Sequence, residues 1–296
     1  MVLEFKEINK SFGEKRVLDQ VTFTASSGKA FGLLGRNGAG KTTSIRILMD
    51  VIPADSGSVL IDGAPIDYDK TRIGYLPEER GLYPKKPIID QLVYFAQLKG
   101  MSRGDAVASV DRWLDRLGMS EYRGKRLDTL SKGNQQKIQL VTALAHDPHV
   151  VILDEPFSGL DPVNAMLLKD VVNEEIGRGK IVLFSSHQMN YIEEFCDSIA
   201  ILSAGRIAVT GDLREIKRSY PRNSLVVRSE AHDAILCKFG DCSTVDESGD
   251  IIIKLSSPEE KGRVMAELAT IGDIDSMMVY EPSLNDIFVE YAKDSI

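Results

Sequence analysis

The chain has 296 residues, of which 43% are hydrophobic and 27% charged, and its formal net charge is −8. This composition is that of a globular protein with room for one large domain and a smaller one. The net negative charge argues against a nucleic-acid partner, because non-specific binding to phosphates depends on accumulated Lys and Arg. The odd number of cysteines (three), without metal-ligand spacing, indicates free thiols in a reducing compartment. The charged start "MVLEFKEINK" does not have the pattern of a signal peptide, and no apolar run approaches the ~18 residues of a membrane-spanning helix.

The first part of the chain alternates between apolar and polar residues in the manner of strands. Strands are predicted over 2–8, 17–25 and 57–63, and together they indicate an antiparallel β layer. Between them, the apolar run "KAFGLLG" ends in glycine and leads through a glycine-rich loop into the helical pattern "TSIRILMDVI". Strand, glycine-rich loop and helix form the context in which a phosphate-binding P-loop is expected.

The middle of the chain, about 88–146, is mainly helical in pattern, and its apolar stripes are best explained by core packing. Two apolar runs follow, "VVILDEP" and "IVLFSSH", which predict buried parallel strands of an α/β sheet. Ligands of such sheets gather at the carboxyl ends of the strands.

A hairpin is predicted to turn at Ala204-Gly205, and a helix follows at 212–220. We place a domain boundary there: residues 1–220 form the first domain, with a helical subdomain at about 88–146, and 221–296 form a small α+β domain. Beyond the boundary the predicted order is strand, helix, two strands, helix, strand, helix, and it suggests a ferredoxin-like arrangement. The fold class is therefore α/β, with an antiparallel β layer, a helical subdomain and a small C-terminal α+β domain.

The stretch "GRNGAGKTT" satisfies the P-loop pattern in full. It comprises Gly35, Arg36, Asn37, Gly38, Ala39, Gly40, Lys41, Thr42 and Thr43. Its glycines allow backbone amides to close around phosphate, Lys41 reaches the β and γ phosphates, and the Thr42 hydroxyl is suited to Mg²⁺. A chance glycine-rich turn is the alternative, and the flanking strand and helix disfavour it.

The run "VVILDEP" supplies the acids that such a site needs. Asp154 ends a predicted buried strand, where its carboxylate is placed to hold Mg²⁺ directly or through water. Glu155 beside it is a candidate to orient and deprotonate the attacking water. A strand followed by Asp-Glu is weak evidence alone, and strong evidence downstream of a full P-loop.

Five motifs occur in a fixed order: the P-loop, "LSKGNQQ", "VVILDEP", "SGLD" and "SSH". In this order they resemble the ATP-binding subunit of an ABC transporter, and the resemblance covers essentially residues 1–218. It implies that "LSKGNQQ" is the signature sequence, which closes over the ATP held by the partner subunit's P-loop. In a head-to-tail dimer, the P-loop of one chain would then bind one nucleotide and its signature sequence would contact the other.

The same resemblance implies further site residues. Phe12 matches the aromatic residue that stacks on adenine, with a strand-end core residue as the alternative. Asp161 matches the loop that crosses the dimer interface, and His187 matches the histidine that contacts the γ-phosphate and helps to position the water. The signature residues are Ser131, Lys132, Gly133, Asn134 and Gln135. His146 and His149, near the end of a predicted helix, are better explained as structural residues than as metal ligands.

The sequence departs from the family pattern at two places. In the signature, Lys132 replaces the first glycine and Asn134 replaces the glutamine, whereas Ser131 and Gly133 are retained. In "YLPEERGLYP", Glu78 stands where the family usually has a glutamine that links Mg²⁺ and water to the transmembrane partner. A carboxylate is a hard oxygen donor, so Glu78 is a further candidate ligand for Mg²⁺. Tyr83 nearby is expected either in the groove that receives a permease helix or in the core.

The resemblance is to exporter-type subunits of the sodium-efflux and drug-resistance kind, and the C-terminal "EPSLNDIFVEY" looks like the tail of that subgroup. It implies an ATPase with Mg²⁺ as cofactor, acting as a dimer that drives a separate membrane permease. Its expected place is the cytoplasm, on the inner face of the membrane through that permease. A soluble ABC-type ATPase in assembly or repair is the alternative, and no coiled-coil insertion favours it. A translation-factor type normally carries two cassettes, whereas this chain carries one.

Overall fold

The computed structural model describes residues 1–79, 81–157, 160–220, 223–246 and 248–293. They form two compact units: Met1–Leu213 with Phe288–Ile296, and Arg214–Ile287. In the described part of the chain, no helix is both long enough and apolar enough to cross a membrane.

The first unit contains the predicted antiparallel layer. Its strands are β1 (Val2–Phe12), β2 (Lys15–Ser26), β4 (Ser56–Ile61) and β5 (Ala64–Pro65), in the sheet order β2-β1-β4-β5. Alternate residues of β1 and β2 point inward, as strands with one buried face require. The prediction of this layer is confirmed.

A second, six-stranded sheet carries the P-loop strand. Its strands are β3 (Ala30–Leu34), β6 (Ile73–Leu76), β7 (Val150–Asp154), β8 (Ile181–Ser186), β9 (Ser198–Ser203) and β10 (Arg206–Asp212), in the order β10-β9-β3-β8-β7-β6. All pairs from β9 to β6 are parallel, so β3 and β7 end at the same edge. The strands β3, β7 and β8 are buried along their whole length, which is why they read as unbroken apolar runs.

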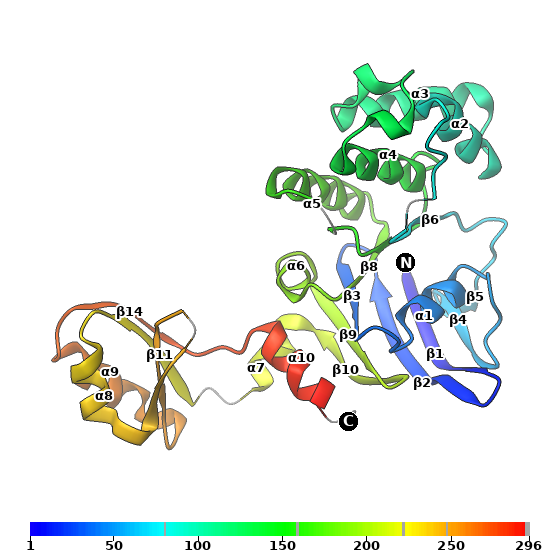
Figure 1. Cartoon of the computed structure of the whole chain (residues 1–296). Helices are drawn as coiled ribbons and strands as arrows, with labels where there is room; N and C mark the ends of the chain where they lie inside the picture. Colours follow the sequence, from blue (N-terminus) through cyan, green and yellow to red (C-terminus); the bar gives the residue numbers. More distant parts are fainter. Residues whose placement is uncertain (80, 158–159, 221–222, 247, 294–296) are drawn as a thin grey trace. The chain divides into compact units, whose positions relative to one another are not determined.

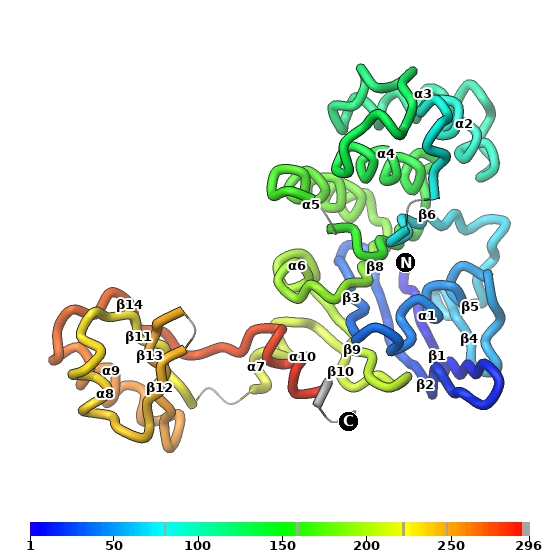
Figure 2. Tube along the Cα trace, in the orientation of Figure 1, coloured from blue at the N-terminus to red at the C-terminus, as the bar shows by residue number. Residues whose placement is uncertain are grey.

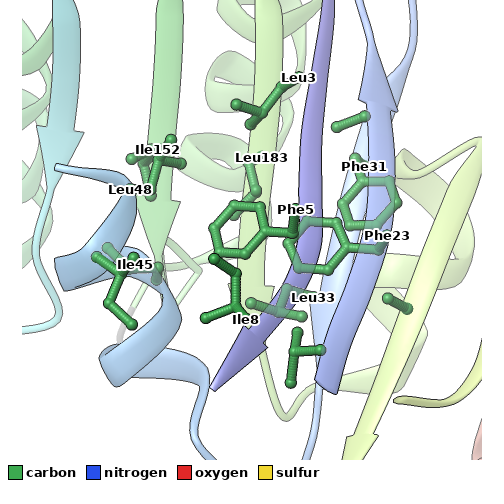
Figure 3. Packing of buried hydrophobic residues seen from close by; sticks show 14 of the residues in the cluster. Leu3, Phe5, Ile8, Phe23, Phe31, Leu33, Ile45, Leu48, Ile152 and Leu183 are labelled. Carbon is green, nitrogen blue, oxygen red and sulfur yellow. The ribbon is translucent and has the colours of Figure 1, made fainter. Parts of the chain in front are cut away.

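The two sheets meet through an aromatic stack. The ring of Phe5 on β1 lies 4.3 Å from that of Phe23 on β2, and Phe23 lies 5.1 Å from Phe31 on β3, centroid to centroid. Leu33, Ile152 and Leu183 of the parallel sheet belong to the same buried cluster (Figure 3). This core holds the two sheets together and fixes the strand that leads into the P-loop.

The helices of the first unit fall into two groups. Helices α2 (Ile88–Leu98), α3 (Arg103–Arg116) and α4 (Lys132–Leu144) lie together, away from the antiparallel layer (Figure 1), and confirm the predicted helical subdomain. The others are α1 (Lys41–Leu48), α5 (Pro162–Gly177) and α6 (Met189–Phe195). Short 3₁₀ turns occur at Ser120–Tyr122 and Leu127–Thr129.

The second unit is a four-stranded antiparallel sheet with two helices. Its course is β11 (Ser224–Ser229), α8 (His232–Phe239), β12 (Ser243–Val245), β13 (Ile251–Lys254), α9 (Lys261–Ala269) and β14 (Ile274–Val279), and Figure 2 traces it. Turns of 3₁₀ helix lie at Gly240–Cys242 and Pro258–Glu260. The sheet order is β12-β13-β11-β14. The order β-α-β-β-α-β along the chain is that of a ferredoxin-like unit.

The compact units divide at Leu213, seven residues before the boundary placed from the sequence. Helix α7 (Leu213–Ser219) therefore falls almost wholly in the second unit, although the amide of Leu213 donates to Asp197 O. Helix α10 (Leu284–Lys293) runs across the division, because Phe288 onward packs with the first unit. Residues 221 and 222, directly after the boundary predicted from the sequence, lie outside the described residues.

Candidate functional site

The P-loop joins β3 to α1, and two of its glycines are required by close approach. At Gly40 φ is 115°, and a Cβ there would lie 2.5 Å from a methyl group of Leu18. A Cβ at Gly35 would lie 2.6 Å from the carbonyl oxygen of Leu202. The contact at Gly35 is with backbone and cannot be relieved by a side-chain movement, and at Gly40 the positive φ strains any residue with a Cβ. These glycines therefore let the loop curl tightly at the N-terminus of α1, where free amides favour an anion.

A cavity of about 450 Å³ opens beside this loop. Its lining includes most of the predicted ATP-binding residues: Phe12, Arg36, Asn37, Gly38, Gly40, Lys41, Thr42 and Thr43. Gly35 and Ala39 belong to the same loop but do not line the cavity. Phe12 is 52% exposed at the end of β1, so the alternative of a core aromatic is wrong. The Lys10 ammonium nitrogen lies over the Phe12 ring, 5.5 Å from the ring centroid, as in a cation–π contact.

Lys41 reaches into the loop from the first turn of α1. Its Nζ donates to Gly35 O at 2.6 Å, and the side chain is buried. Burial lowers the pKa of Lys41, while the charges of Glu155, Asp154 and Glu78 act in the opposite direction. One buried ammonium thus faces three acidic side chains, and all four line the cavity.

Asp154 and Glu155 stand at the carboxyl end of β7, as predicted. Asp154 is 5% exposed, and its Oδ2 accepts a hydrogen bond of 3.1 Å from Tyr75 Oη on β6. Burial raises the pKa of Asp154, and the hydrogen bond from Tyr75 and the charge of Lys41 partly offset this. A cation bound beside Asp154 would relieve the cost of burying its negative charge.

Glu155 is held on both carboxylate oxygens. Oε2 accepts from Ser186 Oγ at 2.9 Å, and Oε1 accepts from the backbone amide of His187 at 2.9 Å. His187 Nδ1 lies 2.6 Å from the same Oε1. The backbone of Glu155 is left-handed, with φ 49°, a conformation that costs energy in a non-glycine residue. The structure therefore pairs the predicted base with the predicted histidine, at a strained position.

The signature residues form the N-terminal turn of α4. Ser131 is the N-cap, and its Oγ accepts from the amide of Asn134 at 3.3 Å. Gln135 Nε2 donates to the carbonyls of Leu127 and Leu130, which fixes the preceding turn. Lys132 is exposed. Among the residues that the structure describes, none of Ser131–Gln135 lines the P-loop cavity of its own chain.

The signature turn lies instead beside the start of α5. Asp161 caps that helix: its Oδ1 accepts from the amide of Asn164 at 3.0 Å, and its Oδ2 accepts from Asn164 Nδ2 at 2.5 Å. A Cβ on Gly133 would lie 3.2 Å from the same Nδ2. Asn164 thus lies between Asp161, the predicted interface residue, and the signature turn. The sequence did not indicate this role for Asn164. Ser158 and Gly159 of the same motif lie outside the described residues.

Two other residues weighed from the sequence are structural. His146 is buried with its Nε2 3.2 Å from Ile73 O, and His149 Nδ1 accepts from the amide of Arg72. In the described parts of the chain, no group of three His, Cys, Asp or Glu side chains is placed to hold a metal ion. The donors suited to Mg²⁺ are instead Thr42, Asp154 and Glu78, which line the P-loop cavity.

A sequence profile described as "ABC transporter" matches residues 18–158. The chain is 41% identical to the Uncharacterized ABC transporter ATP-binding protein YhaQ of Bacillus subtilis (strain 168), over 98% of both chains. The chain belongs to the family of ABC transporter ATP-binding proteins. Members of this family hydrolyse ATP, so the protein is an ATPase. The resemblance drawn from the five ordered motifs is confirmed.

Other matches cover the parts of the chain unequally. The Linearmycin resistance ATP-binding protein LnrL of the same organism is 28% identical, over 97% of both chains. The Nod factor export ATP-binding protein I of Paraburkholderia xenovorans (strain LB400) is 34% identical, over 71% of this chain and 70% of the relative. A profile described as "ATP-binding protein DrrA1-3-like, C-terminal domain" matches residues 211–292. A solved structure, described as an ATP binding subunit of an ABC transporter, superposes with a TM-score of 0.68 at 30% identity, over 74% of this chain and 93% of that chain.

Proposed function

We propose that the protein is the ATP-hydrolysing subunit of an exporter, working as a head-to-tail dimer that drives a separate membrane permease. The position of the signature turn is the observation that supports the proposed dimer. Ser131 does not line the cavity that holds Lys41, whereas a second chain turned head to tail would place its own Ser131 over that cavity.

Within each site, we assign roles from the geometry. ATP lies in the cavity, with its adenine on Phe12 and its phosphates on the P-loop amides and Lys41. Thr42, Asp154 and Glu78 hold Mg²⁺, which neutralises phosphate charge when bound. Glu155 accepts the proton of the attacking water, and His187, already paired with it, helps to place that water near the γ-phosphate.

An exposed aromatic group supports a protein partner. Tyr83 is 57% exposed and Tyr94 52% exposed, and both rings contact Phe95 of α2, at centroid distances of 6.5 and 5.6 Å. Leu98 at the end of α2 is 63% exposed. Apolar side chains grouped on a surface mark interaction sites, so we place the permease against this face of the helical subdomain. We therefore place the protein in the cytoplasm, attached through the permease to the inner face of the membrane.

The relatives favour export. One of them is named for Nod factor export and another for linearmycin resistance. The substrate is selected by the permease rather than by this chain. A soluble ATPase without a membrane partner is the second candidate, and the exposed group around Tyr83 argues against it.

A mixed dimer tests the composite site. In a homodimer, Lys41→Ala and Ser131→Arg each inactivate both sites. When the two variants, with different tags, are co-purified, one site receives both changes and the other receives neither. We expect ATP turnover to return in the mixed dimer. Coupling between the two sites would also prevent turnover from returning, so a second measurement does not depend on turnover. In it, a photoreactive γ-phosphate ATP analogue is bound to a chain carrying Ser131→Arg. Labelling near Ser131 of the other chain supports the proposal, and labelling confined to the chain that binds the analogue overturns it.

A further inference from the structure

Gln139 links the signature helix to the loop that carries Glu78. It lies two turns into α4, and its side chain is 4% exposed. Its Nε2 donates to Pro77 O at 3.3 Å and to Glu79 O at 3.0 Å. One buried amide group thus binds the carbonyls on both sides of Glu78.

These two bonds fix the backbone around Glu78 and leave its side chain in the cavity. The amide nitrogen of glutamine carries two N–H donors, and here each has a carbonyl partner. Glu78 itself is exposed and lines the same cavity as Thr42 and Asp154. An apolar side chain at position 139 would leave both carbonyls without this partner, and the loop would gain freedom.

The strand before Glu78 is tied in a second way. Tyr75, three residues earlier on β6, donates its hydroxyl to Asp154. The segment Tyr75–Glu79 is therefore held at one end to Asp154, the last residue of β7, and at the other to α4. Ser131, the N-cap of the same helix, lies about 12 Å from Gln139 along the axis at 1.5 Å per residue.

We propose that Gln139 is a positioning residue for the nucleotide site: it holds Glu78 at the distance from Asp154 and Thr42 that Mg²⁺ requires. The inference rests on the proposed metal role of Glu78. Gln139 touches neither nucleotide nor metal, and it acts only through the backbone on either side of Glu78. A purely structural amide would instead stabilise the fold without affecting the metal.

The first test measures Mg²⁺ binding rather than turnover. Gln139→Met keeps the length of the side chain and removes the amide, and Gln139→Glu keeps the size and polarity but removes the same donors at neutral pH. Folding is checked by circular dichroism. Binding of a fluorescent ATP analogue is titrated in EDTA and then against Mg²⁺. We expect unchanged affinity in EDTA and a Mg²⁺ requirement raised about tenfold, as for other residues that orient a metal ligand. Thr142→Ala, which removes a hydroxyl bonded within α4, is the matched control and should leave both values unchanged.

The second test asks whether the effect passes through Glu78. In a Glu78→Ala background the Mg²⁺ requirement should already be raised, and adding Gln139→Met should change it less than about twofold. If the double variant instead shows the product of both single effects, Gln139 does not act through Glu78, and the inference is overturned. The inference also fails alone if Glu78→Ala changes the Mg²⁺ requirement and neither Gln139 variant does. If Glu78→Ala has no effect, the proposed metal role of Glu78 fails first, and the positioning role with it.

Discussion

Glu155 and His187 are joined through one oxygen: Oε1 of the glutamate lies 2.6 Å from the imidazole Nδ1 and 2.9 Å from the backbone amide of the histidine. The carboxylate is therefore oriented by groups of the protein itself. The histidine ring is 55% exposed, whereas the glutamate is 5% exposed. The pair therefore consists of a buried carboxylate and an accessible imidazole, which fits the proposed roles of base and of water-positioning residue.

Glu155→Gln should strongly lower ATP turnover and preserve MgATP binding. The amide replaces one carboxylate oxygen with a similar shape, so the bonds to Ser186 and His187 can largely be retained and the fold should survive. Loss of a general base lowers the rate by about 10²–10⁴-fold. The test is steady-state ATP turnover together with size-exclusion chromatography in MgATP, where we expect a trapped dimer. Glu121→Gln, an exposed acid in the helical subdomain, is the control; near-wild-type turnover in Glu155→Gln would reject this residue as the base.

Tyr75→Phe should weaken Mg²⁺ binding. The change removes only the hydroxyl that donates to Asp154 Oδ2, so the carboxylate loses one of the groups that orient it. Removing a partner that orients a metal ligand typically costs about 10–100-fold in affinity or activity. The Mg²⁺ concentration for half-maximal ATP turnover is the measurement. Tyr68→Phe, which removes a hydroxyl bonded to Leu48 O, should leave that concentration unchanged, and an equal shift in both variants would contradict the prediction.

His146 should make the first unit sensitive to acid. Burial lowers its pKa to about 4 from 6.5, and its Nδ1 has no hydrogen-bond partner among the described residues. The unfolded chain therefore binds a proton more readily than the folded one between these values, and stability is lost as pH falls from 6.5 toward 4. Between pH 7 and pH 5 this amounts to about 2 kcal/mol of unfolding free energy.

Urea unfolding at pH 7 and pH 5 measures this loss. The variant His146→Gln keeps a nitrogen for Ile73 O but does not titrate, so its stability should fall less between the two pH values, by about the amount that His146 contributes. Equal losses in the variant and the wild type would show that other groups carry the acid sensitivity.

Phe288→Ala should destabilise the first unit. Phe288 is half-buried and lines a cavity of about 290 Å³ together with P-loop residues Arg36 to Ala39 and the hairpin at Ala204. Removing a fully buried aromatic ring costs about 3–5 kcal/mol, so we expect a smaller loss here, of about 1–2 kcal/mol. Thermal unfolding with and without ATP is the measurement, and Val289→Ala, on the exposed side of α10, is the control. An unchanged melting temperature in Phe288→Ala would mean that this contact contributes nothing.

The sequence predicted the elements with strong periodicity or ordered motifs. The strands around Phe5, Phe23 and Phe31, the P-loop, and the acids after β7 were all recoverable, because each has a local pattern. The short strand β6 and helix α5 were not predicted, since "IGYL" is too short to show a period and α5 has apolar residues on more than one side.

The contacts that orient the site were not recoverable. Tyr75 reaches Asp154 across 79 positions of sequence, and Gln139 reaches Pro77 across 62. A tyrosine in a strand and a glutamine in a helix are ordinary residues there. Only the parallel pairing of β6 with β7 brings Tyr75 close to Asp154, and only the packing of α4 brings Gln139 to the loop around Glu78. The sequence also assigned all of α10 to the C-terminal domain, because nothing in the local pattern indicates that Phe288 onward packs with the first unit.

The return of α10 also bears on how the protein is made. Residues of the first unit occupy both ends of the chain, with the second unit inserted between them. Domains form largely in order of synthesis, yet in this one the cavity that Phe288 lines with the P-loop and the bond from Ser203 to the carbonyl of Tyr291 form only after the second unit has been synthesised. A nascent chain stopped anywhere before Phe288 lacks them. Final packing of the first unit beside residues Arg36 to Ala39 is thereby tied to synthesis of the second unit.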